Sequence, residues 1–164
     1  MPLIDFHRLT LEAYLDRLSR RQPVPGGGSA AALTSALGVG LVSMVGHYSI
    51  GRRSNTKAVQ QRLGKIVRKS EAIRKRLLEL TSLDAQAYLK IVDARKQNAK
   101  IQKQAGRRAA AVGREVCRLC YQAMDLTHFL AAEGNPHLIS DIEVAIELLQ
   151  AGFNSSMIMV RINQ

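Results

Sequence analysis

Residues 23–40 read PVPGGGSAAALTSALGVG, and this segment is the most informative part of the chain. The prolines restrict the backbone on the approach, and three consecutive glycines leave it free to turn. Ser29 follows the glycines, and serine is a favoured N-cap residue at the start of a helix. We therefore predict a proline-flanked glycine loop that leads into a helix over residues 30–49.

The predicted helix 30–49 is built from small residues. Ala32, Ala36 and Gly40 stand four residues apart and form a strip with almost no side chain, which lets another helix backbone come close. Glycine inside a helix costs about 1 kcal/mol relative to alanine, so close packing must compensate. The apolar stretch 29–50 is rich in Gly, Ala and Ser and contains His47. We interpret it as a buried helix and not as a membrane span.

Two further helices are expected around this segment. Asp5 is placed to cap a first helix that ends before Pro23, and another helix is expected to start near Ser54 or Asn55. The core positions of that helix alternate in spacings of four and three residues: Val59, Leu63, Ile66, Ser70, Ile73, Leu77 and Leu80. This heptad seam is typical of long helices in antiparallel or dimeric packing.

The second half of the chain is also helical in pattern. Thr81 and Asp84 have the spacing of a capping box, which predicts that a new helical segment begins there. Helical periodicity continues over residues 99–133, and the run Gly134-Asn135-Pro136 then ends it.

A second capping-box pair, Ser140 and Glu143, predicts the start of a last helix that reaches about Ile162. No segment alternates with period two for long enough to predict a strand. The length of 164 residues fits one domain. We therefore predict an all-α fold, a single helical domain over residues 1–164 in which long antiparallel helices pack as a bundle.

The chain is strongly basic, with a formal net charge of +11. The region 52–118 holds 19 of the 24 Lys and Arg but 5 of the 13 Asp and Glu. Such charge is found in nucleic-acid-binding proteins, yet Tyr88 is the only aromatic residue of this region, and base stacking needs aromatic side chains. Solvated helix faces are the commoner role, and attraction of a small polyanion is another.

Cys117 and Cys120 are the two cysteines. A structural zinc site needs four ligands, and there is no second pair, so we expect reduced, inert thiols and no metal. No stretch resembles a signal peptide, because Asp5 and Arg8 interrupt the start of the chain. A reducing cytoplasm is the expected compartment, without a membrane.

Four features could carry chemistry. The glycines at 26–28 can expose backbone N–H groups to a ligand at a helix N-terminus, or they can mark a tight crossing where only glycine fits. Asp84 and Asp141 are candidate proton-transfer groups if they lie in apolar clefts. Asp141 could instead interact with the helix dipole in a first helical turn, and Asp84 could cap a helix or pair with an arginine. His47 could act as a base near neutral pH or hold a structural hydrogen bond.

Taken together, four segments resemble the cyclodeaminase/cyclohydrolase family. That family includes the C-terminal domain of formiminotransferase-cyclodeaminase and free-standing methenyltetrahydrofolate cyclohydrolases. The matching segments are PVPGGGSAAAL at 23–33, continued by ALG at 36–38 and VSMV at 42–45; DAQAY at 84–88; Gly134-Asn135 with Ser140-Asp141; and Asn163 after Val160 and Ile162. The matches span nearly the whole chain.

The resemblance implies an all-helical homodimer, formed through helix faces, that acts on tetrahydrofolate carrying a one-carbon unit. It implies no cofactor besides this substrate. Asp84 would be the leading proton-transfer residue, and Asp141 with Asn135 would polarise or position the pterin. The residues expected to bind the substrate are Gly26, Gly27, Gly28, Ser29, Asn135 and His47. The basic surface would suit the anionic glutamate tail of folate.

The sequence leaves the precise activity open. Relatives commonly carry Asn-Leu-Thr where this chain has Gly46-His47-Tyr48-Ser49, and they commonly continue past the final Asn where this sequence ends at Gln164. Without a formiminotransferase domain, we expect a cyclohydrolase rather than a cyclodeaminase. The alternatives are a family member without activity that binds a ligand or nucleic acid, or a structural dimer module.

Overall fold

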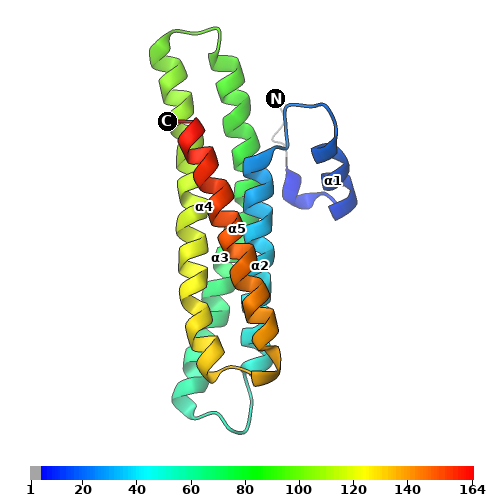
Figure 1. Ribbon diagram of the computed structural model, residues 1–164, viewed down its shortest axis with the longest axis vertical. Coiled ribbons are helices and arrows are strands. Elements are labelled where there is room, and N and C mark those ends of the chain that lie inside the picture. Colours follow the sequence, from blue (N-terminus) through cyan, green and yellow to red (C-terminus); the bar gives the residue numbers. More distant parts are fainter. Residues whose placement is uncertain (1–4) are drawn as a thin grey trace.

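The computed structural model describes residues 5–164, and its main body is an antiparallel four-helix bundle (Figure 1). The bundle helices are α2 (Gly27–Ser49), α3 (Lys57–Ala94), α4 (Ala99–Glu133) and α5 (Ile139–Ile162). Successive helices run in opposite directions, and α5 returns to lie beside α2. The described residues contain no strand. The all-α prediction is confirmed; residues 1–4 of the expected domain lie outside the described residues.

The four helices differ in length. The middle pair is long, with 38 residues in α3 and 35 in α4, whereas α2 has 23 and α5 has 24. The α3–α4 hairpin therefore extends past the start of α2 and the end of α5 (Figure 1). At that end of the bundle, the inner faces of the long helices are not covered by the short ones.

A short helical arm packs beside the bundle near the start of α2. It consists of a 3₁₀ turn at Phe6–Arg8 and helix α1 at Leu11–Ser19. Thr10 caps α1 by accepting a hydrogen bond from the Ala13 N–H, so the prediction that Asp5 caps the first helix is wrong. Asp5 instead precedes the 3₁₀ turn and pairs with His7 and Arg8.

The predicted heptad seam forms the α3 side of the core. Six of its seven residues are buried: Leu63, Ile66, Ser70, Ile73, Leu77 and Leu80. The prediction of a new segment at Thr81 is wrong, because α3 continues unbroken to Ala94. The Thr81 hydroxyl donates to the Leu78 carbonyl at 2.6 Å, so this side chain bonds back within the helix and does not cap a new one.

Helix α2 begins earlier than its sequence predicts. Gly27 and Gly28 are already helical, and Gly26 is the N-cap residue. Ser29 is therefore not the cap: it lies in the first turn and is fully buried. The reason is tertiary, because the Ser29 hydroxyl forms a hydrogen bond with the Tyr14 hydroxyl of α1, at 3.0 Å, and is not free to cap the helix.

The connection into α5 also differs in detail. Gly134 ends α4 as predicted, but a 3₁₀ turn at Pro136–Leu138 comes next and α5 starts at Ile139. Asn135 caps this turn by accepting from the His137 N–H at 3.1 Å. Ser140 therefore lies inside α5, and the capping box predicted for it does not form.

Helix α2 is the core helix, in contact with α3, α4 and α5. It is long and apolar enough to cross a membrane, with a mean hydropathy of 1.6, but most of that stretch is buried within the bundle. Ala32 and Ala36 of the predicted strip are buried, whereas Gly40 is only half-buried beside Arg74. The prediction of a buried helix is confirmed. The close approach of a neighbouring helix backbone occurs at other glycines and not at Gly40.

The crossing of α2 and α5 depends on one glycine from each helix. A Cβ at Gly38 would lie 3.0 Å from the Ala145 carbonyl oxygen of α5. A Cβ at Gly152 would overlap the Ser35 hydroxyl and lie 3.2 Å from the Ala31 carbonyl oxygen of α2. The two backbones therefore pack at a distance that leaves no room for a methyl group at these points.

We expect Gly152→Ala to lower the free energy of unfolding by about 1–3 kcal/mol, the usual cost of overpacking a core. The overlapped Ser35 hydroxyl is fully buried and donates to the Ala31 carbonyl, so it has little room to move. Gly64→Ala is the matched control, because the nearest atom to its Cβ would be the flexible end of Arg68 at 3.6 Å.

That control should raise the free energy of unfolding by about 0.5–1 kcal/mol through helix propensity. Chemical denaturation of both variants measures the difference. Equal stabilities of Gly152→Ala and the parent chain would contradict the close packing described here.

Candidate active site

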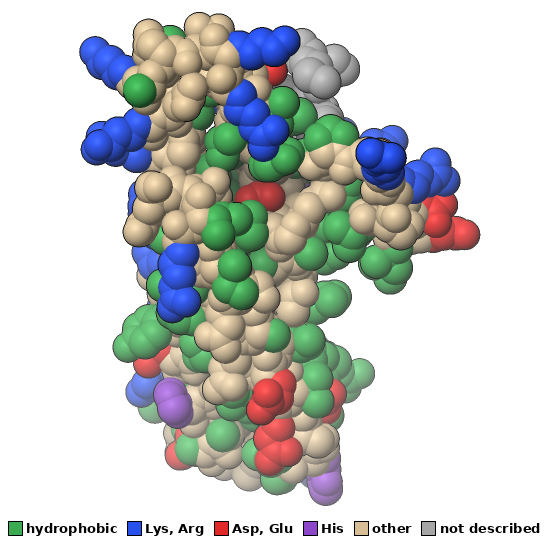
Figure 2. Space-filling view, turned by 45° about the horizontal axis from the view of Figure 1, so that its top comes forward, with side chains coloured by type: hydrophobic (Ala, Val, Ile, Leu, Met, Phe, Trp, Pro, Cys, Tyr) green, Lys and Arg blue, Asp and Glu red, His purple; other side chains and the backbone are tan. Residues whose placement is uncertain are grey.

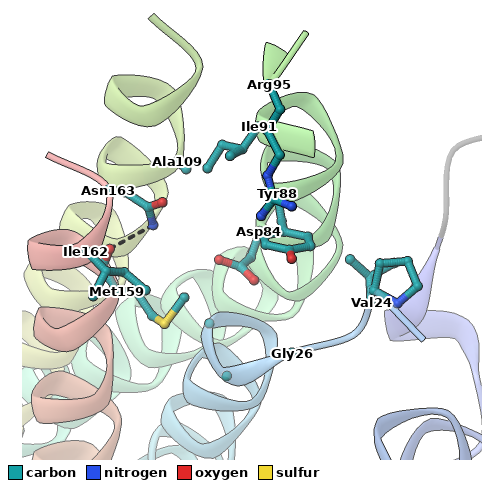
Figure 3. A pocket seen from close by; sticks show the side chains of 13 residues that line it. Val24, Gly26, Asp84, Tyr88, Ile91, Arg95, Ala109, Met159, Ile162 and Asn163 are labelled. Atoms are coloured by element: carbon teal, nitrogen blue, oxygen red, sulfur yellow. Dashed lines mark hydrogen bonds between the residues drawn. The ribbon is translucent and has the colours of Figure 1, made fainter. Parts of the chain in front are cut away.

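A cavity lies at the end of the bundle where the short helices stop and the long ones continue. Its volume is about 420 Å³. The glycine loop lies at its base, α3 forms one wall, and the end of α5 faces that wall (Figure 3). The difference in helix length thus creates a pocket at the N-terminus of α2.

Among residues 5–164, Asp84 is the only acidic side chain that lines this pocket. It stands four residues after Leu80 on α3, so it takes the next position of the heptad seam. At this level α2 has just begun, and the seam residue faces the pocket instead of the core. The sequence signal for Asp84 was therefore an acid at a position where the seam calls for an apolar residue.

The carboxylate of Asp84 rests directly against Gly28. A Cβ at Gly28 would overlap this carboxylate, whereas Gly26 has open space and Gly27 has only Met159 at 3.7 Å. The tight-contact interpretation of the glycine loop is thus confirmed at Gly28, and the ligand-binding interpretation stays a prediction for the other two glycines. Gly28 is the tight contact, and Gly26 and Gly27 present bare backbone to the pocket.

Burial raises the pKa of Asp84 to about 6, from the model-peptide value of 3.8, because the charged form loses water. A hydrogen bond from the Ser29 backbone opposes this shift and favours the carboxylate. The Ser29 N–H belongs to the first turn of α2, where unpaired N–H groups point out of the helix. Asp84 can therefore gain and lose a proton near neutral pH.

Tyr14 does not line the pocket but contacts Ser29 next to it, a contact that the sequence analysis missed. It is buried, and its hydroxyl forms the 3.0 Å hydrogen bond with Ser29. Burial raises the pKa of Tyr14, the Ser29 hydrogen bond lowers it, and the charge of Asp84 raises it. No local pattern could have found Tyr14, because it reaches Ser29 only when α1 docks on the bundle.

The end of α5 forms the opposite wall with Met159, Ile162 and Asn163. The Asn163 amide donates to the Met159 carbonyl at 2.8 Å, which holds the side chain at the pocket edge (Figure 3). Asn163 belongs to the closing segment of the family resemblance, and the structure places it near Asp84.

The structure does not bring Asp141, Asn135 or His47 to this pocket. Asp141 stands in the first turn of α5, 18 residues before Met159, which corresponds to roughly 27 Å along a helix. Asn135 and His47 are at the same remote end, next to the α4–α5 connection and in the last turn of α2. In a single chain they cannot act on a substrate held by Asp84.

The remote residues have structural contacts of their own. Asn135 caps the 3₁₀ turn, and its N–H donates to the Ser49 hydroxyl at 2.9 Å. The Arg52 guanidinium donates to the Gly134 carbonyl. His47 is exposed. These contacts join the α2–α3 and α4–α5 connections to each other.

The cysteines are both free and buried. The Cys120 thiol donates to the Ser35 hydroxyl at 3.1 Å, and burial raises the pKa of Cys120 to about 11. A thiol in that state is protonated near neutral pH and is a poor nucleophile. Within residues 5–164, no three His, Cys, Asp or Glu side chains gather where they could hold a metal ion.

Comparison with known proteins gives consistent matches. Residues 10–164 match the family model described as formiminotransferase-cyclodeaminase. The chain is 34% identical to a methenyltetrahydrofolate cyclohydrolase from Methylorubrum extorquens, over 94% of this chain and 78% of that protein. It is 29% identical to the formimidoyltransferase-cyclodeaminase of Rattus norvegicus, over 94% of this chain but only 30% of that protein.

A solved structure matches as well. The crystal structure of formiminotetrahydrofolate cyclodeaminase from Thermotoga maritima superposes with a TM-score of 0.92 at 29% sequence identity. The match covers 95% of this chain and 78% of that chain. The helical bundle described above is therefore the fold of that protein.

The raised pKa of Asp84 predicts a pH-dependent cost in stability. The folded chain holds the Asp84 proton more tightly than the unfolded chain, so this stabilising contribution is complete below the unfolded pKa of 3.8 and is lost as the pH rises through about 6. Asp84→Asn removes the charge at every pH. We expect the free energy of unfolding of the variant to exceed that of the parent by about 1–2 kcal/mol at about pH 8. This is less than the free energy that corresponds to the full pKa difference, because the pocket is open to solvent.

Chemical denaturation at about pH 8 and about pH 4.5 measures this gain, which should fall to roughly a third at the lower pH. Asp93→Asn is the control, because Asp93 is an exposed acid on the same helix. A gain for Asp84→Asn that does not change with pH would show that burial of the charge is not its cause.

Proposed function

Because this chain belongs to the formiminotransferase-cyclodeaminase family, we propose that it is a folate one-carbon enzyme, and specifically a methenyltetrahydrofolate cyclohydrolase. The observation that carries the proposal is Asp84, a carboxyl group with a pKa of about 6 that is held against the glycine loop in the pocket at the N-terminus of α2. This chain is 34% identical to the methenyltetrahydrofolate cyclohydrolase and spans most of the length of that protein.

The proposed reaction hydrolyses a one-carbon bridge between two nitrogens. The bridge is a cation, and the Asp84 carboxylate would both attract it and accept a proton from the attacking water. The water oxygen bonds to the bridge carbon, one C–N bond breaks, and the proton held by Asp84 passes to the departing nitrogen. The remaining hydroxyl proton is released to solvent as the formyl C=O forms. The cationic bridge and one water thus give a neutral formyl group, an N–H group and one proton, and the reaction needs no cofactor.

The backbone of the glycine loop supports the same step. Gly26 and Gly27 face the pocket, and the first turn of α2 directs its free N–H groups there. Such N–H groups stabilise negative charge on an oxygen as it forms. They are suited to the oxygen that water adds to the bridge carbon.

Cyclodeamination is the second candidate activity, because the superposed crystal structure is of a formiminotetrahydrofolate cyclodeaminase. There the substrate nitrogen closes the ring and ammonia leaves. This step needs a proton on the leaving group, which Asp84 can supply when protonated. The two activities are separated by offering each substrate to the purified protein and measuring loss of methenyl absorbance or release of ammonia.

We expect Asp84→Asn to lower the cyclohydrolase rate at least about a hundredfold, because the amide cannot accept the proton of water. In the parent chain kcat/KM should fall as the pH drops below about 6, since the base must be deprotonated. The assay is methenyl absorbance after subtraction of the uncatalysed rate.

Asp93→Asn again serves as the control and should keep the parent rate. If the parent chain binds the folate substrate but turns over neither candidate, the alternative of a binding protein without activity replaces the enzyme. A pH profile without a decline near 6 would remove Asp84 as the base.

We also propose that the chain is a cytoplasmic homodimer that pairs through α2 and α5. Both helices carry exposed or half-buried apolar residues at heptad spacing on faces that the bundle does not cover: Leu37, Leu41, Met44 and Tyr48 on α2, and Val144, Leu148 and Ile158 on α5. Leu37 is 56% and Val144 is 51% exposed. A second copy with the same seams would cover them.

Leu37→Glu and Val144→Glu are expected to shift the chain toward monomer in sedimentation, because each would bury a charge in the interface. Leu15→Glu is the control, since Leu15 is 51% exposed on α1, away from both helices. A parent chain that sediments as a monomer at all concentrations would contradict the dimer.

A further inference from the structure

One face of α3 presents four chemically different residues to the pocket in a fixed order. Asp84, Tyr88, Ile91 and Arg95 are spaced by four, three and four residues, so they form a stripe along the helix (Figure 3). The stripe runs from an acid, past an aromatic ring and an aliphatic side chain, to a cation. From Asp84 to Arg95 its backbone length is roughly 16 Å.

Arg95 is the cation of this stripe, and its backbone stands at the outer end. It follows the last residue of α3 and lines the pocket, and Figure 3 shows its side chain extending from the end of α3 back along the wall that carries Ile91 and Tyr88. Within residues 5–164, its guanidinium forms no ion pair and no hydrogen bond. It is therefore available to a ligand.

The other basic side chains of this end differ from Arg95 in position. Figure 2 shows Lys and Arg gathered around the α3–α4 connection. Lys96 and Lys100 belong to that group, but neither lines the pocket. They contribute to a general positive field, whereas Arg95 is the only Lys or Arg among the described residues that the pocket itself contacts.

We propose that Arg95 binds a carboxylate of the glutamate on the folate substrate, while Tyr88 and Ile91 contact its aminobenzoyl ring. The inference rests on the proposed function and adds the residue that recognises the glutamate tail of the substrate. A tetrahydrofolate carries its reacting ring, its aryl ring and its carboxylates in that order along one molecule, and the stripe offers matching chemistry in the same order.

Each contact has a physical basis. Arginine presents a planar fork of N–H donors that fits both oxygens of a carboxylate. Tyr88 is half-buried and presents an aromatic surface on which another ring can stack. A substrate held at both ends would place its one-carbon bridge at Asp84 without needing a tight fit around the pterin.

The kinetic test compares methenyltetrahydrofolate with an analogue in which both glutamate carboxyls are primary amides. In the parent chain the diamide should raise KM roughly tenfold or more, the size expected for losing a charged hydrogen bond, with kcat little changed. In Arg95→Ala the two substrates should have the same KM. Arg95→Lys should keep part of the difference, because it retains the charge but not the fork.

Lys96→Ala is the matched control, since it removes one positive charge from the neighbouring residue outside the pocket. It should keep the parent ratio between the two substrates. The assignment of Arg95 would be overturned if Arg95→Ala kept the parent ratio of the two KM values, or if Lys96→Ala lost that ratio as well. Either result would leave the cyclohydrolase activity in place.

A binding measurement separates this inference from the proposed function. The fragment N-(4-aminobenzoyl)-L-glutamate and its diamide are titrated into the parent chain and Arg95→Ala by NMR. If the parent chain prefers the charged fragment and Arg95→Ala does not, the Arg95 site is supported. This holds even if the protein does not turn over the methenyl substrate, in which case the proposed reaction is wrong and the binding site is not. Equal binding of the two fragments to the parent chain would overturn the Arg95 site.

Discussion

Helix α2 packs so close to its neighbours that certain positions have no space for a side chain, and the rest of the molecule depends on this. Gly38 and Gly152 let α2 and α5 approach one another in the middle of the bundle, and Gly28 lets the start of α2 approach Asp84 on α3. The first contact determines the spacing of the core. The second holds a carboxyl group against the first turn of a helix, where free N–H groups and an open cavity meet. The same kind of packing therefore serves stability in one place and chemistry in another.

The site is the continuation of the core beyond the point where two of its four helices end. The heptad seam of α3 supplies Leu77 and Leu80 to the core, and its next position is Asp84. An acid at a seam position lowers the stability of the fold when it is charged, and the raised pKa of Asp84 reflects this cost. Such a local departure from good packing is common where a protein has a function, and the well-packed remainder of the bundle tolerates it.

The pocket is also polarised along its length. Asp84 lies against the glycine loop, and Arg95 stands at the outer end of α3 with its side chain extending back toward Tyr88 (Figure 3). A cationic one-carbon bridge and an anionic tail on one substrate would be drawn to opposite ends, so charge alone favours one orientation. The basic α3–α4 end would add a longer-range attraction for anions. Under the proposed function, attraction of the substrate would give the positive charge of the chain a role that does not require nucleic acid.

The sequence by itself determined the features that depend on local periodicity and local backbone chemistry. These are the helical class, the seam of α3, the end of α4 at Gly134, and the special status of the glycine loop and Asp84. The tertiary structure alone decided which ends of the helices meet. It separated Asp141, Asn135 and His47 from Asp84, brought Tyr14 to Ser29, moved the start of α2 into the glycines, and carried α3 through Thr81. Periodicity along a chain shows which face of a helix is buried, but not the direction of the neighbouring helix or the length over which it covers that face.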